Sequence, residues 1–193
     1  ETQKLEDSIH YLLLSTGQNN EKAKEKLKEM FEKVDLSKLV VNLRIEYLKF
    51  LSNENISEAQ YQLGVLYLEG ILVHQNMEKS VDYLSMAADQ NHVESQYQLG
   101  LLYLEGKLVH RNVYKSHDYF KRASQKHHCE SLYQLGILYY EGIYVEKNIL
   151  EAKKCFSIAL VNLPPSITSI GNNAFKNCSS LSRITILSSV TSI

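Results

Sequence analysis

The sequence predicts a mainly α protein, a right-handed α/α solenoid assembled from helix-pair repeats. First, Tyr-Gln-Leu-Gly recurs at residues 61–64, 97–100 and 133–136, which sets a period of 36 residues. Second, each copy continues through apolar residues to a Glu-Gly pair. Third, an asparagine and another apolar-periodic segment follow each pair. A unit of two helices cannot cover both apolar faces alone, so the units must stack on one another.

The first 55 residues are also predicted to be helical, although they are less regular. Apolar residues recur there at three- and four-residue spacing. They form stripes at Leu5, Ile9, Leu12 and Leu13; at Ala23, Leu27, Met30, Phe31 and Val34; and at Leu36, Leu39, Val40, Leu43, Tyr47, Leu48 and Leu51. In the lysine-rich segment 20–33, glutamates nearly balance the lysines, which favours a solvated helix over a membrane-surface helix. We interpret residues 1–55 as degenerate repeats or as a helical cap on the array.

The first helix of each repeat is expected to end at a glycine. Gly70 and its equivalents in the next two copies follow the apolar-periodic segment, where a residue in the left-handed conformation ends a helix. Gly64 and its equivalents lie inside the same helix, where glycine costs about 1 kcal/mol relative to alanine. Close approach of a neighbouring helix is the compensation that we expect.

The second helix of each repeat is expected to begin at an asparagine. Asn76, Asn112 and Asn148 stand at equivalent positions, and asparagine is among the best acceptors for the free amides of a helix start. In the first copy, apolar residues from Met77 to Ala88 recur at three- and four-residue spacing, while charged residues fill the opposite side. The second helix therefore buries one face and exposes the other.

The repeated pattern resembles the Sel1-like repeat, a relative of the tetratricopeptide repeat. The residues that carry the resemblance are Ala59, Leu63, Gly64, Tyr67, Gly70, Ala87 and Ala88. The later copies depart from it with Ser95 and Ser131 at the first alanine and with Leu160 in the closing pair. The resemblance implies three repeats over residues 56–160. It also implies a protein-interaction scaffold that assembles signalling or quality-control complexes, and it implies no reaction.

The last segment, residues 161–193, changes character at its two prolines, Pro164 and Pro165. Ile-Thr-Ser-Ile at residues 167–170 returns as Val-Thr-Ser-Ile at the end of the chain, twenty-three residues later. This pattern resembles the bacterial-surface-type leucine-rich repeat, which implies a short β-containing segment with a strand at Arg183–Ile186. A solenoid needs about three units, so we interpret this segment as a partial, truncated repeat of a longer protein.

Composition argues against several classes of protein. The formal net charge is −1 and no basic stripe gathers along the chain, so we expect no nucleic-acid partner. The apolar runs are far shorter than the ~20 residues that cross a bilayer, so we expect no membrane span. Three cysteines at unrelated spacings argue against a disulfide framework, which mildly favours a reducing, cytoplasmic compartment. Composition makes no prediction of the oligomeric state.

The sequence contains no catalytic or cofactor motif. It lacks a phosphate-cradling glycine loop, a metalloprotease histidine pair and a paired-cysteine knuckle, so we expect no enzyme activity, no cofactor and no metal site. His127-His128-Cys129 offers ligands that suit zinc, but it lies in the turn between repeats and lacks a fourth ligand. His74 and His110 are replaced by Glu146 in the third copy, which is typical of a tolerant surface loop.

By analogy with tetratricopeptide arrays, we expect a protein or peptide partner to bind the groove-facing side of the first helices. The candidate residues are Glu58, Tyr61, Val65, Leu68 and Glu69; Glu94, Tyr97, Leu101, Leu104 and Glu105; and Glu130, Tyr133, Ile137, Tyr140 and Glu141. The predicted groove is apolar with acidic edges. Positions that recognise a partner usually differ between copies, so the repeated tyrosines have an alternative interpretation as packing between repeats.

A glutamate ends each of these helices, at Glu69, Glu105 and Glu141. A carboxylate at a helix C-terminus opposes the macrodipole by about 0.3–1 kcal/mol, so local helix physics does not explain three of them. We prefer the interpretation that they pair across the loop with basic residues such as Arg111 and Lys147. The alternative is that they bind a basic partner.

These observations predict a non-catalytic scaffold or adaptor that captures an amphipathic or basic segment of another protein. One alternative is a regulatory arm of a larger enzyme, such as a kinase, whose catalytic domain precedes Glu1. Another alternative is a surface adhesin whose leucine-rich repeats continue beyond Ile193.

Overall fold

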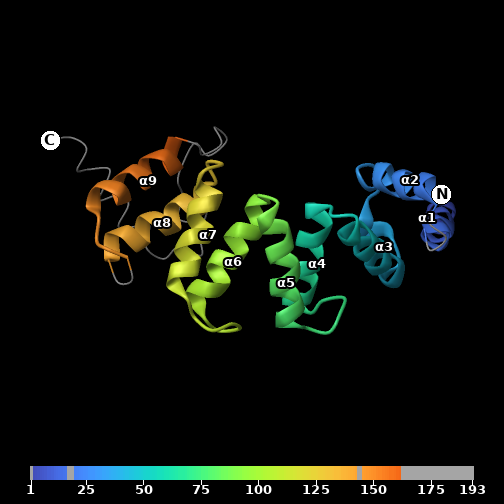
Figure 1. The fold of residues 1–193 in the computed structure, drawn as a ribbon, viewed down its shortest axis with the longest axis horizontal. Coiled ribbons are helices and arrows are strands. Elements are labelled where there is room, and N and C mark those ends of the chain that lie inside the picture. Colours follow the sequence, from blue (N-terminus) through green and yellow to red (C-terminus); the bar gives the residue numbers. More distant parts are fainter. Residues whose placement is uncertain (1, 17–19, 143–144, 162–193) are drawn as a thin grey trace. The chain divides into compact units, whose positions relative to one another are not determined.

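The computed structural model describes residues 2–16, 20–142 and 145–161, and the regular structure in these ranges is helical (Figure 1). The chain forms two compact units, Glu1–Arg122 and Ala123–Ile193. The predicted mainly α fold, built from helix pairs, is confirmed. No helix within these ranges is long and apolar enough to cross a bilayer.

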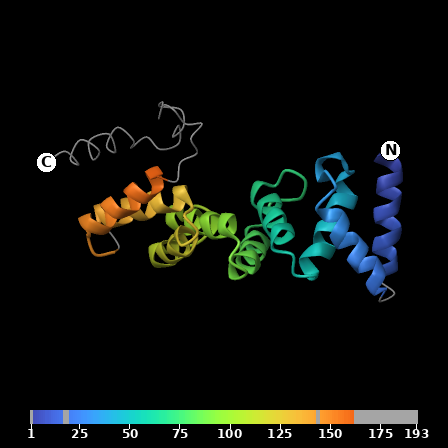
Figure 2. The ribbon, with the colours of Figure 1, turned by 90° about the horizontal axis from the view of Figure 1, so that it is seen from above.

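The first unit begins with helices that lie beside one another (Figure 2). Their side chains share one apolar core. These elements are α1 (Thr2–Thr16), α2 (Glu21–Phe31), the 3-10 helix η1 (Leu36–Lys38) and α3 (Val41–Asn53). Ile9, Leu27 and Leu48 are fully buried in this core, as their place in the apolar stripes predicts. The hydroxyl of buried Tyr47 donates a hydrogen bond to the carbonyl of Leu27, which joins α3 to α2.

The predicted repeats are helix pairs. In the first unit they are α4 (Ser57–Glu69) with α5 (Met77–Asp89), and α6 (Val93–Glu105) with α7 (Val113–Ser124). In the second unit they are α8 (Cys129–Glu141) with α9 (Ile149–Val161). The first helices of the three pairs begin 36 residues apart, as the sequence period predicts.

The predicted ends of these helices are confirmed. The glycines after the first helices, Gly70, Gly106 and Gly142, have φ values of 69°, 67° and 67°. The Asn76 side chain accepts a hydrogen bond from the backbone N–H of Lys79 at 2.9 Å, and Asn112 and Asn148 accept the equivalent bond at 3.0 Å. In all three repeats, a glycine in the left-handed conformation therefore ends the first helix, and an asparagine side chain caps the start of the second.

The glycines inside the first helices allow the second helix of the same repeat to approach closely. A Cβ added at each would lie 2.7 Å from Leu84 at Gly64, 2.5 Å from Phe120 at Gly100 and 2.4 Å from Phe156 at Gly136. These distances are well below van der Waals contact, so the predicted close approach is confirmed. Beside the first of these contacts, Ser80 Oγ donates to the Gly64 carbonyl at 2.8 Å.

Buried glutamines join successive helix pairs within the first unit. Gln60 Nε2 on α4 donates to the carbonyl of Ser52 at 3.2 Å, near the end of α3. Gln96 Nε2 on α6 donates to the carbonyl of Ala88 at 3.0 Å, near the end of α5. Each first helix is thus tied by its second turn to the end of the preceding second helix.

Helices α2 and α3 keep the 36-residue register of the repeats. Helix α3 begins and ends 36 residues before α5, and α2 begins 36 residues before α4. Buried Ala23 and Leu27 stand 36 residues before Ala59 and Leu63. Asn55, which follows α3, has a φ of 62°, and its equivalent after α5 has a φ of 63°. This register favours the degenerate-repeat interpretation of the N-terminal region over a cap of different structure.

The predicted leucine-rich-repeat segment, residues 161–193, lies outside the described residues except for Val161 at the end of α9. Its predicted strand at Arg183–Ile186 also lies outside them.

Candidate functional site

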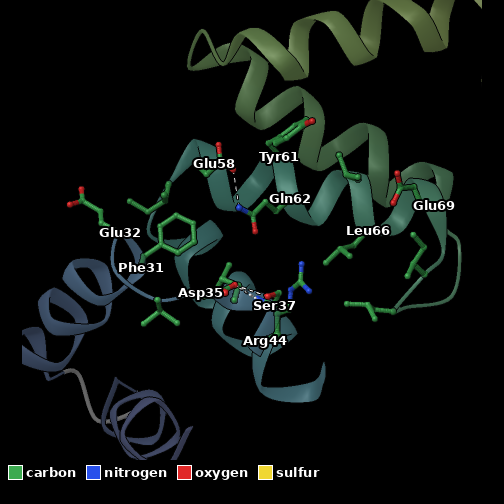
Figure 3. A pocket seen from close by; sticks show the side chains of 16 residues that line it. Phe31, Glu32, Asp35, Ser37, Arg44, Glu58, Tyr61, Gln62, Leu66 and Glu69 are labelled. Carbon is green, nitrogen blue, oxygen red and sulfur yellow. Dashed lines mark hydrogen bonds between the residues drawn. The ribbon is translucent and has the colours of Figure 1, made fainter. Parts of the chain in front are cut away.

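The first unit contains an open pocket of about 1040 Å³ beside α4 (Figure 3). Its apolar walls come from Phe31, Val34, Leu36, Ile56, Tyr61, Val65, Leu66, Ile71 and Leu72. Its charged lining residues are Glu32, Asp35, Glu58, Glu69 and Arg44. Ligand sites in proteins commonly measure about 300–1,000 Å³, so this pocket can hold a short peptide segment. The sequence predicts a groove of this kind, which is apolar with acidic edges.

Four of the five candidates from the first repeat line this pocket. They are Glu58, Tyr61, Val65 and Glu69, whereas half-buried Leu68 is not among the lining residues. Residues three and four positions apart share one face of a helix, and Figure 3 shows Glu58, Tyr61 and Glu69 along α4. The structure therefore brings most of the first-copy candidates together.

The rings of Tyr61 and His92 pack together beside this pocket. Their centroids are 4.8 Å apart, and His92 Nε2 lies 3.1 Å from a carboxylate oxygen of Glu58. Burial raises the pKa of the Tyr61 hydroxyl, and the carboxylates of Glu94, Glu58 and Glu69 raise it further. The tyrosine thus stays neutral on a surface that carries acidic groups from both α4 and α6.

The second-copy candidates lie on α6 in the same unit. Tyr97 packs on the ring of Phe120 with a centroid separation of 6.0 Å. Leu101 and Leu104 are half-buried, and Glu94 and Glu105 are exposed. This contact lies within one repeat, between α6 and α7, so it gives Tyr97 a packing role but is not the packing between repeats that the sequence suggested, and Leu101 and Leu104 remain partly exposed.

The third-copy candidates lie on α8 in the second unit. Tyr133 is 6% exposed and packs on Phe156 with a centroid separation of 5.8 Å. Tyr133 is therefore packed within its own repeat, between α8 and α9, which differs from the packing between repeats that the sequence suggested. Ile137 is half-buried, Tyr140 is 41% exposed, and Glu130 and Glu141 are exposed.

The glutamates at the ends of the first helices differ in their contacts. Glu105 pairs with Lys107 at 3.3 Å, while Arg111 Nε donates to the backbone carbonyl of Leu104 at 3.0 Å. Glu69 is exposed and makes no ion pair within the described part of the chain. An ion pair beside the loop therefore gives the glutamate at the end of α6 a local partner. The glutamate at the end of α4 has no such partner among the described residues.

The histidines between repeats are helix caps. Nδ1 of His92 accepts the backbone N–H of Ser95 at 3.2 Å, and Nδ1 of His128 accepts that of Ser131 at 3.3 Å. Burial raises the pKa of the neighbouring Cys129 thiol, which disfavours the thiolate form that binds metals. In the ranges that the structure describes, no group of three or more His, Cys, Asp or Glu residues could hold a metal ion.

Arg44 lines the pocket although no sequence motif marked it. It lies on α3, and its Nε is buried without a hydrogen-bond partner among the described residues. The sequence signal that could have found it is the 36-residue register. That register makes α3 the second helix of a repeat and so places it against α4.

The comparisons with known proteins agree with this architecture. Residues 57–92 and 93–128 match the family model of the Sel1 repeat, and residues 143–193 match that of the BspA type leucine rich repeat region. The two Sel1 matches contain the helix pairs α4–α5 and α6–α7. The chain therefore contains Sel1 repeats and carries a leucine-rich-repeat match at its C-terminal end. The latter match begins before α9, so its first part overlaps the third helix pair.

Two solved structures show similar folds. A Sel1 repeat protein from Oxalobacter formigenes is 28% identical with a TM-score of 0.57, over 62% of this chain and 90% of its own. A protective antigen with an SLR fold from uropathogenic Escherichia coli strains is 22% identical with a TM-score of 0.62, over 81% of this chain and 33% of its own. No curated protein matches the chain significantly in sequence. Sel1 repeats generally serve as protein-interaction scaffolds and are typically not catalytic.

Proposed function

We propose that the chain is a non-catalytic scaffold that binds an amphipathic, basic segment of another protein along α4 and α6, the first helices of the two repeats in its first unit. The observation that carries the proposal is the pocket of the first unit, where four α4 candidates chosen from the sequence line one wall. Carboxylates outnumber the guanidinium among its charged lining residues. Complementary charge steers partners and suppresses wrong ones, so a cationic segment with apolar side chains fits this surface.

Glu69 supports a binding role because it does little for the fold. Its carboxylate stands at the C-terminus of α4, where it opposes the helix dipole by about 0.3–1 kcal/mol. Its side chain is exposed and has no ion pair within the described ranges. A partner's lysine or arginine would turn this local cost into an attractive contact.

The test measures binding of the full chain to a panel of amphipathic peptides that differ in carrying lysine or glutamate at their polar positions. We expect the lysine peptides to bind. We also expect Glu69→Lys to weaken that binding while the thermal midpoint stays equal or rises, because the substitution relieves the dipole conflict. Asp82→Lys makes the same charge change on an exposed residue of α5 outside the pocket and serves as the control. Equal binding by wild type and Glu69→Lys would contradict the basic-segment proposal.

A second candidate function is a surface adhesin, which the leucine-rich-repeat match over residues 143–193 favours. In that case, protease added to intact native cells should degrade the protein, whereas a cytoplasmic marker should survive. Protection of the protein alongside the marker would argue against this candidate. The regulatory-arm alternative stays a prediction.

A further inference from the structure

Arg44 is the one basic residue among the described side chains that line the pocket. It lies on α3, and in Figure 3 its side chain points from α3 toward α4. Its Nε is buried and has no hydrogen-bond partner in the part of the chain that the structure describes. A buried charged donor without a partner is costly, so Arg44 is a group that a ligand could satisfy.

Two of the neighbouring carboxylates, those of Asp35 and Glu58, are engaged elsewhere. Asp35 accepts hydrogen bonds from the backbone N–H and the hydroxyl of Ser37, at 3.1 and 2.6 Å. Glu58 accepts from Gln62 at 2.8 Å and lies 3.1 Å from His92 Nε2. No ion pair joins Arg44 to a carboxylate among the described residues. Arg44 therefore lines the pocket with a guanidinium that no carboxylate of the described residues pairs with.

We propose that this pocket recognises an acidic side chain of the bound segment, whose carboxylate Arg44 binds. The inference rests on the proposed function, because it names the chemistry of the same partner at the same groove. A guanidinium presents parallel N–H donors that match a carboxylate, and apolar walls such as Val65 and Leu66 strengthen the contact by excluding water. The surrounding carboxylates disfavour a doubly charged phosphate more than a singly charged carboxylate.

The acidic residues on α4 set the order of charges in the segment. Glu58 stands near the start of α4 and Glu69 at its end, so they are about 16 Å apart along the helix axis. An extended peptide covers that distance in about five residues. The matching segment is therefore basic, apolar, acidic, apolar and basic in order. Because basic residues stand on both sides, the carboxylate belongs to an internal aspartate or glutamate rather than to a chain terminus.

The test uses the full chain and a peptide blocked at both ends, Lys-Val-Glu-Leu-Lys, with a second peptide in which glutamine replaces the glutamate. Fluorescence anisotropy should show that the glutamine peptide binds about 10- to 100-fold more weakly, which is the effect of losing one charge-assisted contact. Arg44→Met should remove this difference. Lys49→Met removes an exposed positive charge from the same helix outside the pocket and should preserve the difference.

Folding of Arg44→Met is checked by its thermal midpoint, and Arg44→Lys provides a second variant that keeps the charge but loses the fork of donors. Equal binding of both peptides to wild type would overturn the role of Arg44 while leaving the proposed function standing. Failure of both peptides to bind would overturn this inference and count against the proposed function as well. Stronger binding of a peptide whose only carboxylate is its free C-terminus would overturn the assignment to an internal acidic residue.

Discussion

Gly100 on α6 packs closely against the fully buried ring of Phe120 on α7. A Cβ at Gly100 would lie 2.5 Å from Cε1 and 2.6 Å from Cδ1 of Phe120, which is 0% exposed. Gly100→Ala gains about 1 kcal/mol of helix propensity, but overpacking a core typically costs ~1–3 kcal/mol. We expect a net loss of about 0–2 kcal/mol in unfolding free energy, measured by urea denaturation.

The double variant Gly100→Ala with Phe120→Leu tests whether the ring causes this loss. Leucine is the residue that faces the equivalent Gly64, so Gly100→Ala should cost less when it is combined with Phe120→Leu than when the native ring is present. A stabilised Gly100→Ala variant would show that helix propensity outweighs the contact.

His117 on α7 is predicted to make the first unit sensitive to acid. Burial lowers its pKa below the ordinary value of 6.5, Lys121 lowers it further, and Asp118 opposes them. The folded state therefore favours the neutral ring, and the unfolded chain takes up the proton first as the pH falls. Stability from this residue is complete above pH 6.5 and is lost as the pH falls from 6.5 toward the lower folded pKa.

Urea denaturation at about pH 7.5 and about pH 5.5 measures this effect. His117→Gln, which does not titrate, should lose less stability between the two conditions than wild type. An equal loss in both proteins would assign the acid sensitivity to other groups.

At the scale of elements, the two glutamine junctions should differ in strength. Gln96 Oε1 has no hydrogen-bond partner in the described part of the chain, and the Ala88 carbonyl that Gln96 contacts also accepts from Arg122 at 2.6 Å. Leu132 stands at the equivalent position of the third repeat and is 4% exposed. We therefore expect Gln96→Leu to change the unfolding free energy by less than about 0.5 kcal/mol.

Gln60→Leu is the matched comparison at the α3–α4 junction. Gln60 donates to the Ser52 carbonyl and to Asn55 Oδ1, both at 3.2 Å, and accepts from Gln90 Nε2 at 2.7 Å, so leucine would break three hydrogen bonds, of which the one to Ser52 is buried. We expect a loss of about 1–2 kcal/mol in thermal or urea denaturation. Equal effects of the two substitutions would contradict this account of the junctions.

The helices of the repeats could be predicted because their signals are local. A glycine in the left-handed conformation and an asparagine cap act within a few residues of the chain, so a short motif reveals them. For α2 and α3, the sequence left open whether they are degenerate repeats or a cap, because this region lacks the same signals. Lys28, Val34 and Val40 stand where the later copies have the inner glycine, the terminal glycine and the asparagine. Only the 36-residue spacing of buried apolar residues remains in this region. That spacing becomes clear chiefly when the structure shows which helices form pairs.

At the scale of the whole molecule, the candidate site could be predicted in part. One side of the pocket follows from the period of α4, because a helix places Glu58, Tyr61, Val65 and Glu69 on one face. The opposite side depends on how α3 and the α2–α3 connection pack against α4, which is a tertiary property. Arg44 therefore has no sequence signature of its own.

Leu99 tests the repeat register of the first unit as a whole. It lies on α6, is 0% exposed and shares an apolar cluster with Leu84 and Ala88 of α5. Truncating a buried leucine to alanine costs about 2–5 kcal/mol, and in a repeat array that loss weakens the interfaces on both sides of the affected helix. Leu99→Ala should therefore lower the thermal midpoint and speed amide hydrogen exchange in α5, α6 and α7.

Leu101→Ala is the control for Leu99→Ala, because this half-buried residue lies on the same helix and keeps accessible surface. It should change stability less. In a stacked array, helix α1 should exchange as in wild type, since coupling passes mainly between neighbouring repeats. Unchanged melting of Leu99→Ala would mean that Leu99 does not stand at a core position of the repeat. Equal acceleration of exchange in α1 would instead mean that the first unit unfolds as one cooperative body rather than repeat by repeat.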